Sequence, residues 1–128
     1  MRLHATTLVV RDYDEAISFF TGKLGFQLAE DSDLGGGKRW VRVTPSPGEA
    51  GILLARAVGT AQQAAIGNAA GGRVAFFLHT DDFAFRYAQM LANGVHFREK
   101  PRSEAYGKVA VFEDLYGNPW DLVGPGQS

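Results

Sequence analysis

Hydrophobic and polar residues along the first part of the chain predict a strand followed by a helix. Leu3 to Val10 is rich in β-branched and apolar residues, which is typical of a strand. Asp12 then offers a helix N-cap, and Glu15 three residues later completes a capping-box pattern. The apolar positions that follow at helical spacing are Ile17, Phe20 and Leu24. Gly25 is placed to end this helix in a left-handed cap.

Three further strands complete the first half of the pattern. We expect them at Phe26 to Glu30, Lys38 to Thr44 and Gly51 to Arg56. The glycines Gly35 to Gly37 predict a turn between the first two, and Pro45 to Gly48 predicts another before the last. The first half is therefore expected to be a strand, a helix and three strands.

The same pattern then begins again. Arg73 to Thr80 reads as a strand, Asp81-Asp82 supplies a helix cap, and Gly94 closes the helix. The apolar stripe of this helix consists of Phe83, Tyr87 and Met90 or Leu91. Three more strands are expected at Val95 to Arg98, Val109 to Phe112 and Trp120 to Val123, the last two joined by a turn at Tyr116-Gly117-Asn118.

The two halves form an internal repeat. The helix from Asp12 to Gly25 and the helix from Asp81 to Gly94 have the same length, and LGFQL after the first matches NGVHF after the second. The sequence thus predicts one α+β domain of two βαβββ modules, residues 1–58 and 73–128, joined by a linker at 59–72 in which Thr60 to Ile66 form a short helix. Curved mixed sheets packed together would leave a cup-shaped cavity, and ligands favour such concave junctions.

Composition narrows the classes of function. A chain of 128 residues has the size of a single domain, and a net charge of −1 without long runs of like charge makes nucleic acid an improbable partner. There is no cysteine, which excludes disulfides, thiolate metal sites and a cysteine nucleophile. The longest apolar run, Val74 to Leu78, is too short to span a membrane. The start, MRLHATTLVVRDYD, lacks the apolar core of a secretory signal, so we expect a cytoplasmic protein.

Three stretches resemble a known superfamily. TTLVVRDYDEAISFFTGKLGF (Thr6 to Phe26) is similar to the opening of vicinal oxygen chelate proteins, and FEDLYGNPWDLV (Phe112 to Val123) to their closing D-x-x-G-N turn and acidic residue. GVHFREKPRSEAYGKVAVF (Gly94 to Phe112) resembles the stretch between. This superfamily contains the glyoxalase, bleomycin-resistance and extradiol-dioxygenase groups. The resemblance implies paired βαβββ modules around a ligand cavity, a scaffold that serves many chemistries.

The resemblance also implies where a metal would bind. In metal-dependent members, His, Gln or Glu side chains hold one divalent ion, and the corresponding positions here are Ala5, Ala75 and Asp121. His4 is one residue from the first position, and such an offset reverses the face of a strand unless a β-bulge restores it. We therefore expect no tightly bound metal. If Zn, Ni, Mn or Fe does bind, Asp121 with His4 or His79 would hold it.

Strand alternation indicates which side chains reach the cavity. In the first strand Ala5, Thr7 and Val9 would face inward, and in the last strand Asp121 would do so. Asp121 could be a solvated carboxylate at the rim, a polar contact to a ligand, a metal ligand or a general base. His79, also facing inward, could act in acid–base catalysis because its reference pKa is near neutrality, or it could only form hydrogen bonds. These two residues are the candidate catalytic pair.

Other residues are candidates for binding a small molecule. Trp40 and Arg42 alternate onto one face of their strand and suit a planar or anionic ligand, although cross-strand packing would explain them as well. Phe77 is expected to line the cavity, and Tyr106 lies in PRSEAYG, which we interpret as a loop able to close over it. The set of candidate binding residues is Thr7, Trp40, Arg42, Phe77, His79, Tyr106 and Asp121.

These observations lead to two hypotheses about function. The first is a protein that binds a small organic molecule in the cavity without a metal, similar to bleomycin-resistance members. The alternative is an enzyme of the same superfamily, a metal-dependent lyase or isomerase like glyoxalase, or a dioxygenase, acting on a substrate with vicinal oxygens. Acid–base catalysis by His79 without a metal is a third possibility. A homodimer is expected, with apolar contact from Trp40 or the Ala-rich linker.

Overall fold

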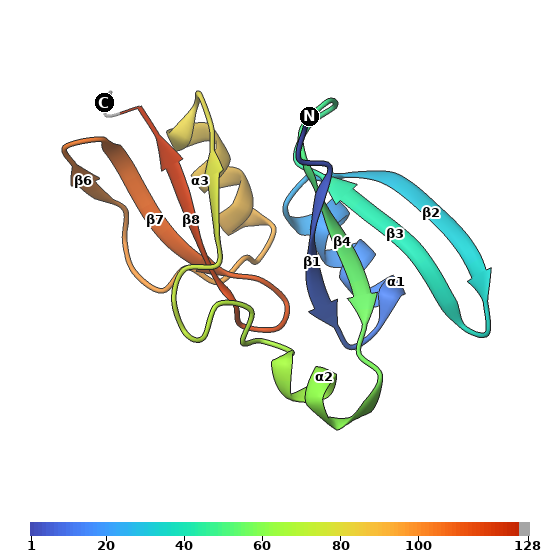
Figure 1. The fold of residues 1–128 in the computed structure, drawn as a ribbon. Helices are drawn as coiled ribbons and strands as arrows, with labels where there is room; N and C mark the ends of the chain where they lie inside the picture. Colours follow the sequence, from blue (N-terminus) through green and yellow to red (C-terminus); the bar gives the residue numbers. More distant parts are fainter. Residues whose placement is uncertain (126–128) are drawn as a thin grey trace. The chain divides into compact units, whose positions relative to one another are not determined.

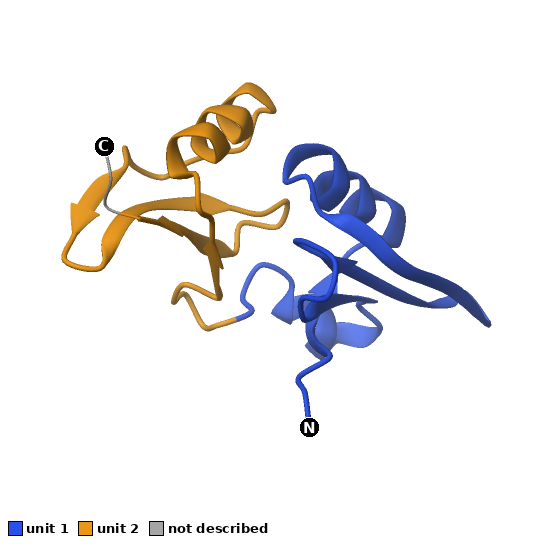
Figure 2. Ribbon diagram, turned by 90° about the horizontal axis from the view of Figure 1, so that it is seen from above, with its two compact units in different colours: residues 1–69 blue, residues 70–128 orange. Residues whose placement is uncertain are grey.

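The chain forms two compact units that divide between Ala69 and Ala70 (Figure 2). The computed structural model describes residues 1–125. Each unit is a βαβββ module with a four-stranded mixed sheet, as the sequence predicts. No helix in residues 1–125 is long and apolar enough to cross a membrane.

The first unit follows the predicted order of elements (Figure 1). Its elements are β1 (Ala5–Val10), α1 (Tyr13–Ser18), the π-helical turn η1 (Phe19–Lys23), β2 (Gln27–Gly35), β3 (Lys38–Thr44), β4 (Gly51–Arg56) and α2 (Gly59–Ala65). The strand order is β1-β4-β3-β2, with β1 parallel to β4 and the other pairs antiparallel. The strand predicted at Phe26 to Glu30 is longer than expected, because it continues to the glycine turn.

The ends of the first helical segment are formed by the residues that the sequence indicates. The Asp12 carboxylate accepts a hydrogen bond from the Glu15 backbone N–H at 2.9 Å, which satisfies one of the free donors at the helix start. Gly25 has φ 75, the left-handed conformation that glycine adopts without strain. Between them, the helix widens into η1.

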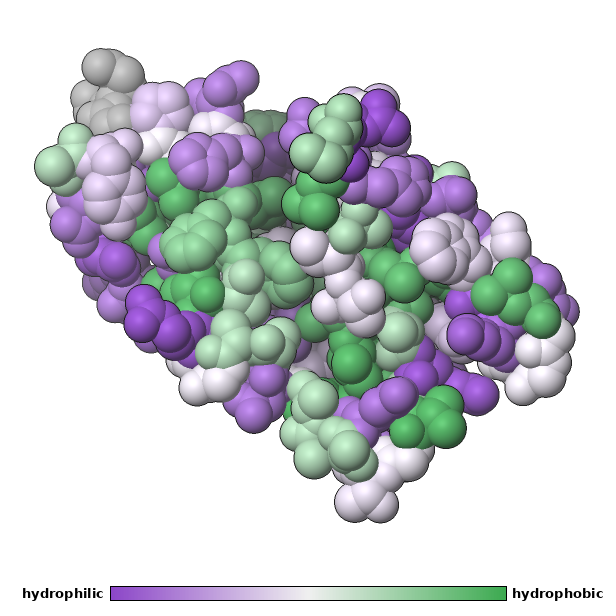
Figure 3. All heavy atoms as spheres, in the orientation of Figure 1, coloured by the Kyte–Doolittle hydropathy of each residue, from purple (hydrophilic) through white to green (hydrophobic). Residues whose placement is uncertain are grey.

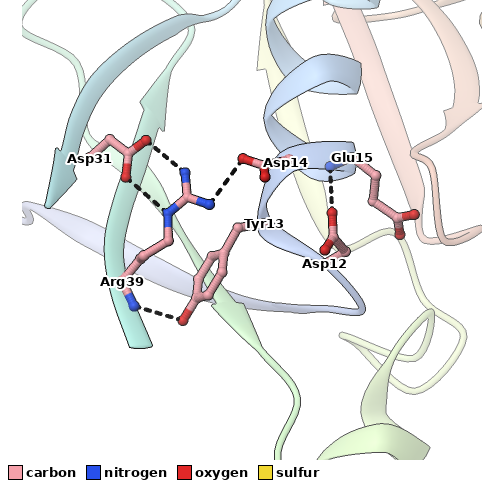
Figure 4. A network of polar contacts seen from close by, with 6 residues as sticks. All are labelled: Asp12, Tyr13, Asp14, Glu15, Asp31 and Arg39. Atoms are coloured by element: carbon pink, nitrogen blue, oxygen red, sulfur yellow. Dashed lines mark hydrogen bonds and ion pairs between the residues drawn. The ribbon is translucent and has the colours of Figure 1, made fainter. Parts of the chain in front are cut away.

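Arg39 of β3 fastens the helix to the sheet in this unit (Figure 4). Its guanidinium donates to Asp14 of α1 at 2.9 Å and to Asp31 of β2 at 2.8 and 3.2 Å. The Arg39 backbone N–H also donates to the Tyr13 hydroxyl at 3.1 Å. These hydrogen bonds lower the pKa of Asp31 and raise that of Arg39. Beneath them lies an apolar core that includes Leu8, Val10, Ala16, Phe20, Val41, Val43 and Leu54.

The second unit repeats this architecture with shorter strands. Its elements are β5 (Phe76–His79), α3 (Phe83–Ala92), β6 (Arg102–Glu104), β7 (Gly107–Glu113) and β8 (Pro119–Gly124). The strand order β5-β8-β7-β6 matches that of the first unit position by position. The Asp82 carboxylate accepts from the Phe85 N–H at 3.2 Å, and Gly94 has φ 84, so this helix also begins and ends as predicted.

The prediction of a strand at Val95 to Arg98 was wrong. The segment forms only an isolated bridge, Phe97 to Phe112, with backbone hydrogen bonds from Arg98 to Val111 at 2.8 Å and from Glu113 to His96 at 2.9 Å. Besides β8, the strand paired with β7 is β6, in the segment that we interpreted as a loop, and Glu104 pairs with Gly107 across a two-residue turn. The Phe97 ring also packs against aromatic rings, with ring centroids 4.7 Å from Tyr87 and 5.7 Å from Phe112.

Candidate functional site

In each unit, one face of the sheet packs against the helix and the other carries the predicted site residues. Across the first sheet, Thr7 is in register with Leu53, and Leu53 with Arg42. Leu8 and Val10, which alternate with Thr7, are buried against the helix side. Thr7 and Arg42 therefore lie on the face opposite α1, as alternation predicts.

Three predicted residues of the first unit meet at a glutamate that sequence reasoning did not select. Arg42 Nε donates to Glu30 Oε1 at 2.6 Å, and His4 Nε2 lies 3.4 Å from the same oxygen. Hydrogen bonds from Arg42 and Trp40 lower the pKa of the Glu30 carboxyl, and His4 contributes in the same direction. Glu30 is in register with Arg42 only because β2 has a bulge between Leu28 and Glu30, which alternation in the sequence does not reveal.

His4 reaches this cluster without the β-bulge in the first strand that would otherwise be needed. β1 begins at Ala5, so His4 precedes the strand and is not bound by its alternation. Its carbonyl accepts from the Gly51 N–H at 2.9 Å, which anchors the segment to β4. His4 is thereby a partner of Glu30.

Asp121 lies on the face of the second sheet opposite α3. It is in register with Phe77 on one side and Val111 on the other, while its neighbours Trp120 and Leu122 are buried on the helix side. The Asp121 side chain is also buried, at 7% exposure, and Oδ1 has no hydrogen-bond partner among residues 1–125. Burial raises the pKa of the Asp121 carboxyl. The positive charge of Arg102 acts in the opposite direction and offsets part of this rise.

The cation near Asp121 is engaged elsewhere. Arg102 Nε donates to Glu104 at 2.6 Å, and Nη1 donates to Glu99. These hydrogen bonds raise the pKa of Arg102 and direct its Nε and Nη1 to other carboxylates. Glu99 raises the pKa of Asp121, so the charge of Arg102 compensates the buried carboxyl only in part, and within residues 1–125 no hydrogen bond does so at Oδ1.

The remaining predicted residues of the second unit differ in position. Phe77 is 64% exposed beside Asp121. His79 is exposed on the same face and in register with Val123, but within residues 1–125 no hydrogen bond or ion pair joins it to Asp121. Tyr106 is exposed in the turn between β6 and β7.

A buried polar network sets the start of β8. The Asp114 carboxylate accepts from the backbone N–H groups of Tyr116 and Asn118 at 2.9 and 3.1 Å. It also accepts from the Asn118 side-chain amide at 3.0 Å and from Trp120 Nε1 at 3.1 Å. This network shapes the D-x-x-G-N turn of the sequence and fixes the strand that presents Asp121.

The residues at the expected metal-ligand positions do not fit a metal. Ala5 and Ala75 have no donor atom in their side chains, which leaves the Asp121 carboxylate, whereas a catalytic zinc commonly has three protein ligands. In the described part of the chain, no three His, Asp or Glu side chains are grouped closely enough to hold an ion.

Hydrophobic side chains gather over the sheet of the second unit and are flanked by hydrophilic ones (Figure 3). Phe77 is among the large apolar residues that remain exposed in this unit. Exposed apolar surface with a polar border is characteristic of binding sites.

Comparisons with known proteins agree with this geometry. An uncharacterized protein of Shewanella frigidimarina (strain NCIMB 400) is 55% identical over 119 residues, which cover 91% of this chain and 87% of that protein. The crystal structure of UcmS2 superposes with a TM-score of 0.84 at 29% identity, covering 96% of this chain and 97% of UcmS2. TnmS3, an antibiotic binding protein from Streptomyces sp. CB03234, superposes with a TM-score of 0.78 at 25% identity, covering 98% and 96% of the two chains.

The model of one family matches residues 2–122, nearly the whole chain, in agreement with the resemblance seen in the sequence. The chain belongs to the glyoxalase/bleomycin resistance protein/dioxygenase superfamily.

Proposed function

We propose that this protein binds a small organic molecule against the sheet face of its second unit that lies opposite α3, without a bound metal. The observation that carries the proposal is the buried Asp121 carboxyl, whose Oδ1 lacks a partner, beside the exposed ring of Phe77. The likeness to TnmS3, an antibiotic binding protein, supports a ligand of this kind.

The Asp121 carboxyl is a hydrogen-bond acceptor, so we expect it to contact a donor group of the ligand. A buried polar atom without a hydrogen bond costs about 1–3 kcal/mol, so native proteins keep few of them. Because Oδ1 is itself buried, the carboxyl would have to turn toward the ligand, and a hydroxyl or amine of the ligand would then donate to it and remove this cost. The fold thus offers an acceptor that a ligand can satisfy and that Arg102, held by Glu99 and Glu104, does not.

The neighbouring side chains suit an aromatic ligand. The exposed Phe77 ring offers an apolar surface that would gain from being covered. In the second unit, His79 and Tyr106 are the proposed polar contacts. On the first sheet, we propose Thr7, Trp40 and Arg42 as binding residues of that unit. Trp40 and Arg42 present an indole and a guanidinium on one strand face, a combination that binds planar groups.

The chemistry of the ligand positions favours binding over metal-dependent catalysis. Alanine replaces a donor residue at positions 5 and 75, and the single carboxylate of Asp121 would form a weak site. The metal-dependent lyase, isomerase or dioxygenase therefore requires ligands that these positions do not supply. We assign no reaction to His79 and Asp121.

We also propose that the protein forms a homodimer, since Trp40 and other apolar side chains are exposed. Sedimentation would detect it as a species of twice the 13.9 kDa chain mass. A 13.9 kDa species alone at high concentration would refute the homodimer.

The binding proposal can be tested by NMR titration of the labelled full chain with naphthol, a planar aromatic with one hydroxyl donor. We expect saturable shifts at the amides of Phe77 and Asp121. Phe77→Ala should weaken binding about ten- to hundred-fold, since burying an aromatic ring contributes about 1.5–3 kcal/mol. Phe85→Ala is the matched control, because Phe85 is an exposed phenylalanine on α3. Equal losses in both variants would contradict the proposed site.

A further inference from the structure

The first module contains a pocket of its own, at the end of its sheet where β1 begins and β3 ends. Its volume is about 160 Å³. The polar and charged side chains in its lining are Arg2, His4, Gln27, Arg42, Thr44 and Glu49. Pockets for drug-sized ligands measure about 300–1,000 Å³, so this one suits a smaller molecule or a single functional group.

Most of these polar and charged side chains can donate hydrogen bonds. Arg2 and Arg42 are always charged, and Gln27 and Thr44 carry an amide and a hydroxyl. Glu49 in the lining and Glu30, which is paired with Arg42, balance the charges of the two arginines. A group with several acceptor oxygens is therefore the complement of the donors in this lining.

Arg42 is fixed in place before any ligand binds. Its side chain is 14% exposed, and Nε donates to Glu30 at 2.6 Å. The side chain lies across Gly51, where an added Cβ would be 2.6 Å from Arg42 Cγ and 2.9 Å from Nη1. Glycine at position 51 thus creates the space for this arginine, and a fixed side chain loses little entropy on binding.

The outer edge of the Arg42 guanidinium remains available. Within residues 1–125, its hydrogen bond and ion pair both go to Glu30 through Nε, which leaves the donors on Nη1 and Nη2. Two parallel N–H groups on a planar fork match the two oxygens of a carboxylate. We propose that this pocket binds the carboxylate group of a small organic acid, with Arg42 as its main donor and Thr44 and Gln27 as further donors.

This inference shares Arg42 with the proposed function but goes beyond it, because the pocket is formed within the first module and involves neither Asp121 nor Phe77. Acetate is the simplest probe. We expect NMR titration of the full chain with acetate, at constant ionic strength, to give saturable shifts at the amides of Thr44 and Gly51. A matched chloride titration shows what ionic strength alone does.

Three variants assign the binding to Arg42. Arg42→Gln should weaken acetate binding about ten-fold, the loss expected for a charge-assisted hydrogen bond. Arg42→Lys should also weaken it, because an ammonium lacks the planar fork. Gly51→Ala keeps the arginine but pushes it out of position, and should weaken binding as well. Arg11→Gln, which removes an exposed arginine paired with Glu15 in the same module, should leave binding unchanged.

Several results would overturn the proposal. Equal shifts with chloride would reduce the effect to ionic strength, and tighter binding of phosphate than acetate would make the pocket a general anion site. If Arg42→Gln binds acetate as tightly as the wild type, Arg42 is not a donor to the bound carboxylate. If Arg42→Gln fails to fold in thermal unfolding, Arg42→Lys and Gly51→Ala decide the question. Acetate and naphthol titrations of Phe77→Ala, which leaves this pocket intact, separate a failure here from a failure of the proposed function.

Discussion

The pKa values of Asp121 and Glu30, two acidic residues of the site, are shifted in opposite directions by their surroundings. Glu30 is surrounded by donors from Arg42 and Trp40, which lower its pKa. Asp121 is buried without a partner for Oδ1, and burial raises its pKa. At neutral pH the charged Asp121 therefore destabilises the folded protein, whereas the charged Glu30 stabilises it.

Asp121→Asn should raise the thermal unfolding temperature by a few degrees at neutral pH, because it removes an uncompensated buried charge. Because the pKa of Asp121 is raised in the folded protein, its charge lowers the free energy of unfolding fully at pH values above the folded-state pKa. This penalty disappears as the pH falls from the folded-state pKa to the ordinary value of about 3.9. The advantage of the variant should fade over the same range. Thermal unfolding followed by circular dichroism from neutral to acidic pH measures this, and a pH-independent difference would contradict it.

Glu30→Gln provides the control of opposite sign. Because the pKa of Glu30 is lowered, its contribution is present above the ordinary value of about 4.3 and is lost as pH falls through the folded-state pKa. The variant should be less stable than the wild type at neutral pH and should converge with it in acid. Convergence in the reverse direction would contradict the arrangement of donors around this carboxylate.

At the scale of the elements, the contact between α3 and β8 depends on a glycine. A Cβ added at Gly124 would lie 2.6 Å from Phe83 Cβ and 3.2 Å from the Thr80 carbonyl oxygen. Neither atom is at the flexible end of a side chain, so the helix would have to move. By contrast, a Cβ at Gly22 in η1 meets no atom within 4 Å.

Gly124→Ala should therefore destabilise the protein by about 1–3 kcal/mol, the range for overpacking a tight contact. Gly22→Ala is the matched control and should be neutral or stabilising by up to about 1 kcal/mol, since alanine favours helices and has room there. Chemical denaturation of both variants gives the two values. A Gly124→Ala variant as stable as the control would show that α3 does not press on β8 at this position.

Local signals in the sequence were sufficient for most elements of the fold. Asp12 and Asp82 cap their helices because a short acidic side chain accepts from the first turn, and this depends on nearby residues alone. The segment expected as a strand at Val95 to Arg98 forms only an isolated bridge at one end of β7, because β6 pairs with the other end, next to the turn before Gly107. Strand pairing and tertiary packing override an apolar run.

The candidate site was predictable only in part, for the same reason. Alternation placed Arg42 and Asp121 on the faces opposite their helices, because the period of a strand is local. Glu30 was missed because a bulge in β2 shifts its register. Within residues 1–125, Oδ1 of Asp121 has no hydrogen-bond partner, and Arg102 donates to Glu99 and Glu104 instead. The spacing of these residues in the sequence does not reveal this arrangement.

At the scale of the whole molecule, two modules with the same strand order present different chemistry on equivalent faces. The first carries the charged cluster around Glu30, and the second carries Phe77 and a buried carboxyl. In a repeat whose halves have diverged in this way, each module offers different groups to a ligand.

Elemental analysis of the protein, purified without chelator, should find far less than one divalent ion per chain. The reason is that Ala5 and Ala75 stand where metal-dependent relatives are expected to have ligands. Dialysis against nickel, zinc, manganese or iron before the measurement extends the test. A stoichiometric ion that is lost in Asp121→Ala would contradict metal-free binding.

The most direct test of the central claim compares naphthol with its methyl ether in NMR titrations of the wild type and Asp121→Ala. Both probes have the same aromatic surface, but only naphthol has a hydroxyl that can donate to the Asp121 carboxyl. We predict that the wild type binds naphthol about ten-fold more tightly than the ether and that Asp121→Ala binds the two equally. Equal binding of both probes by the wild type would contradict the claim.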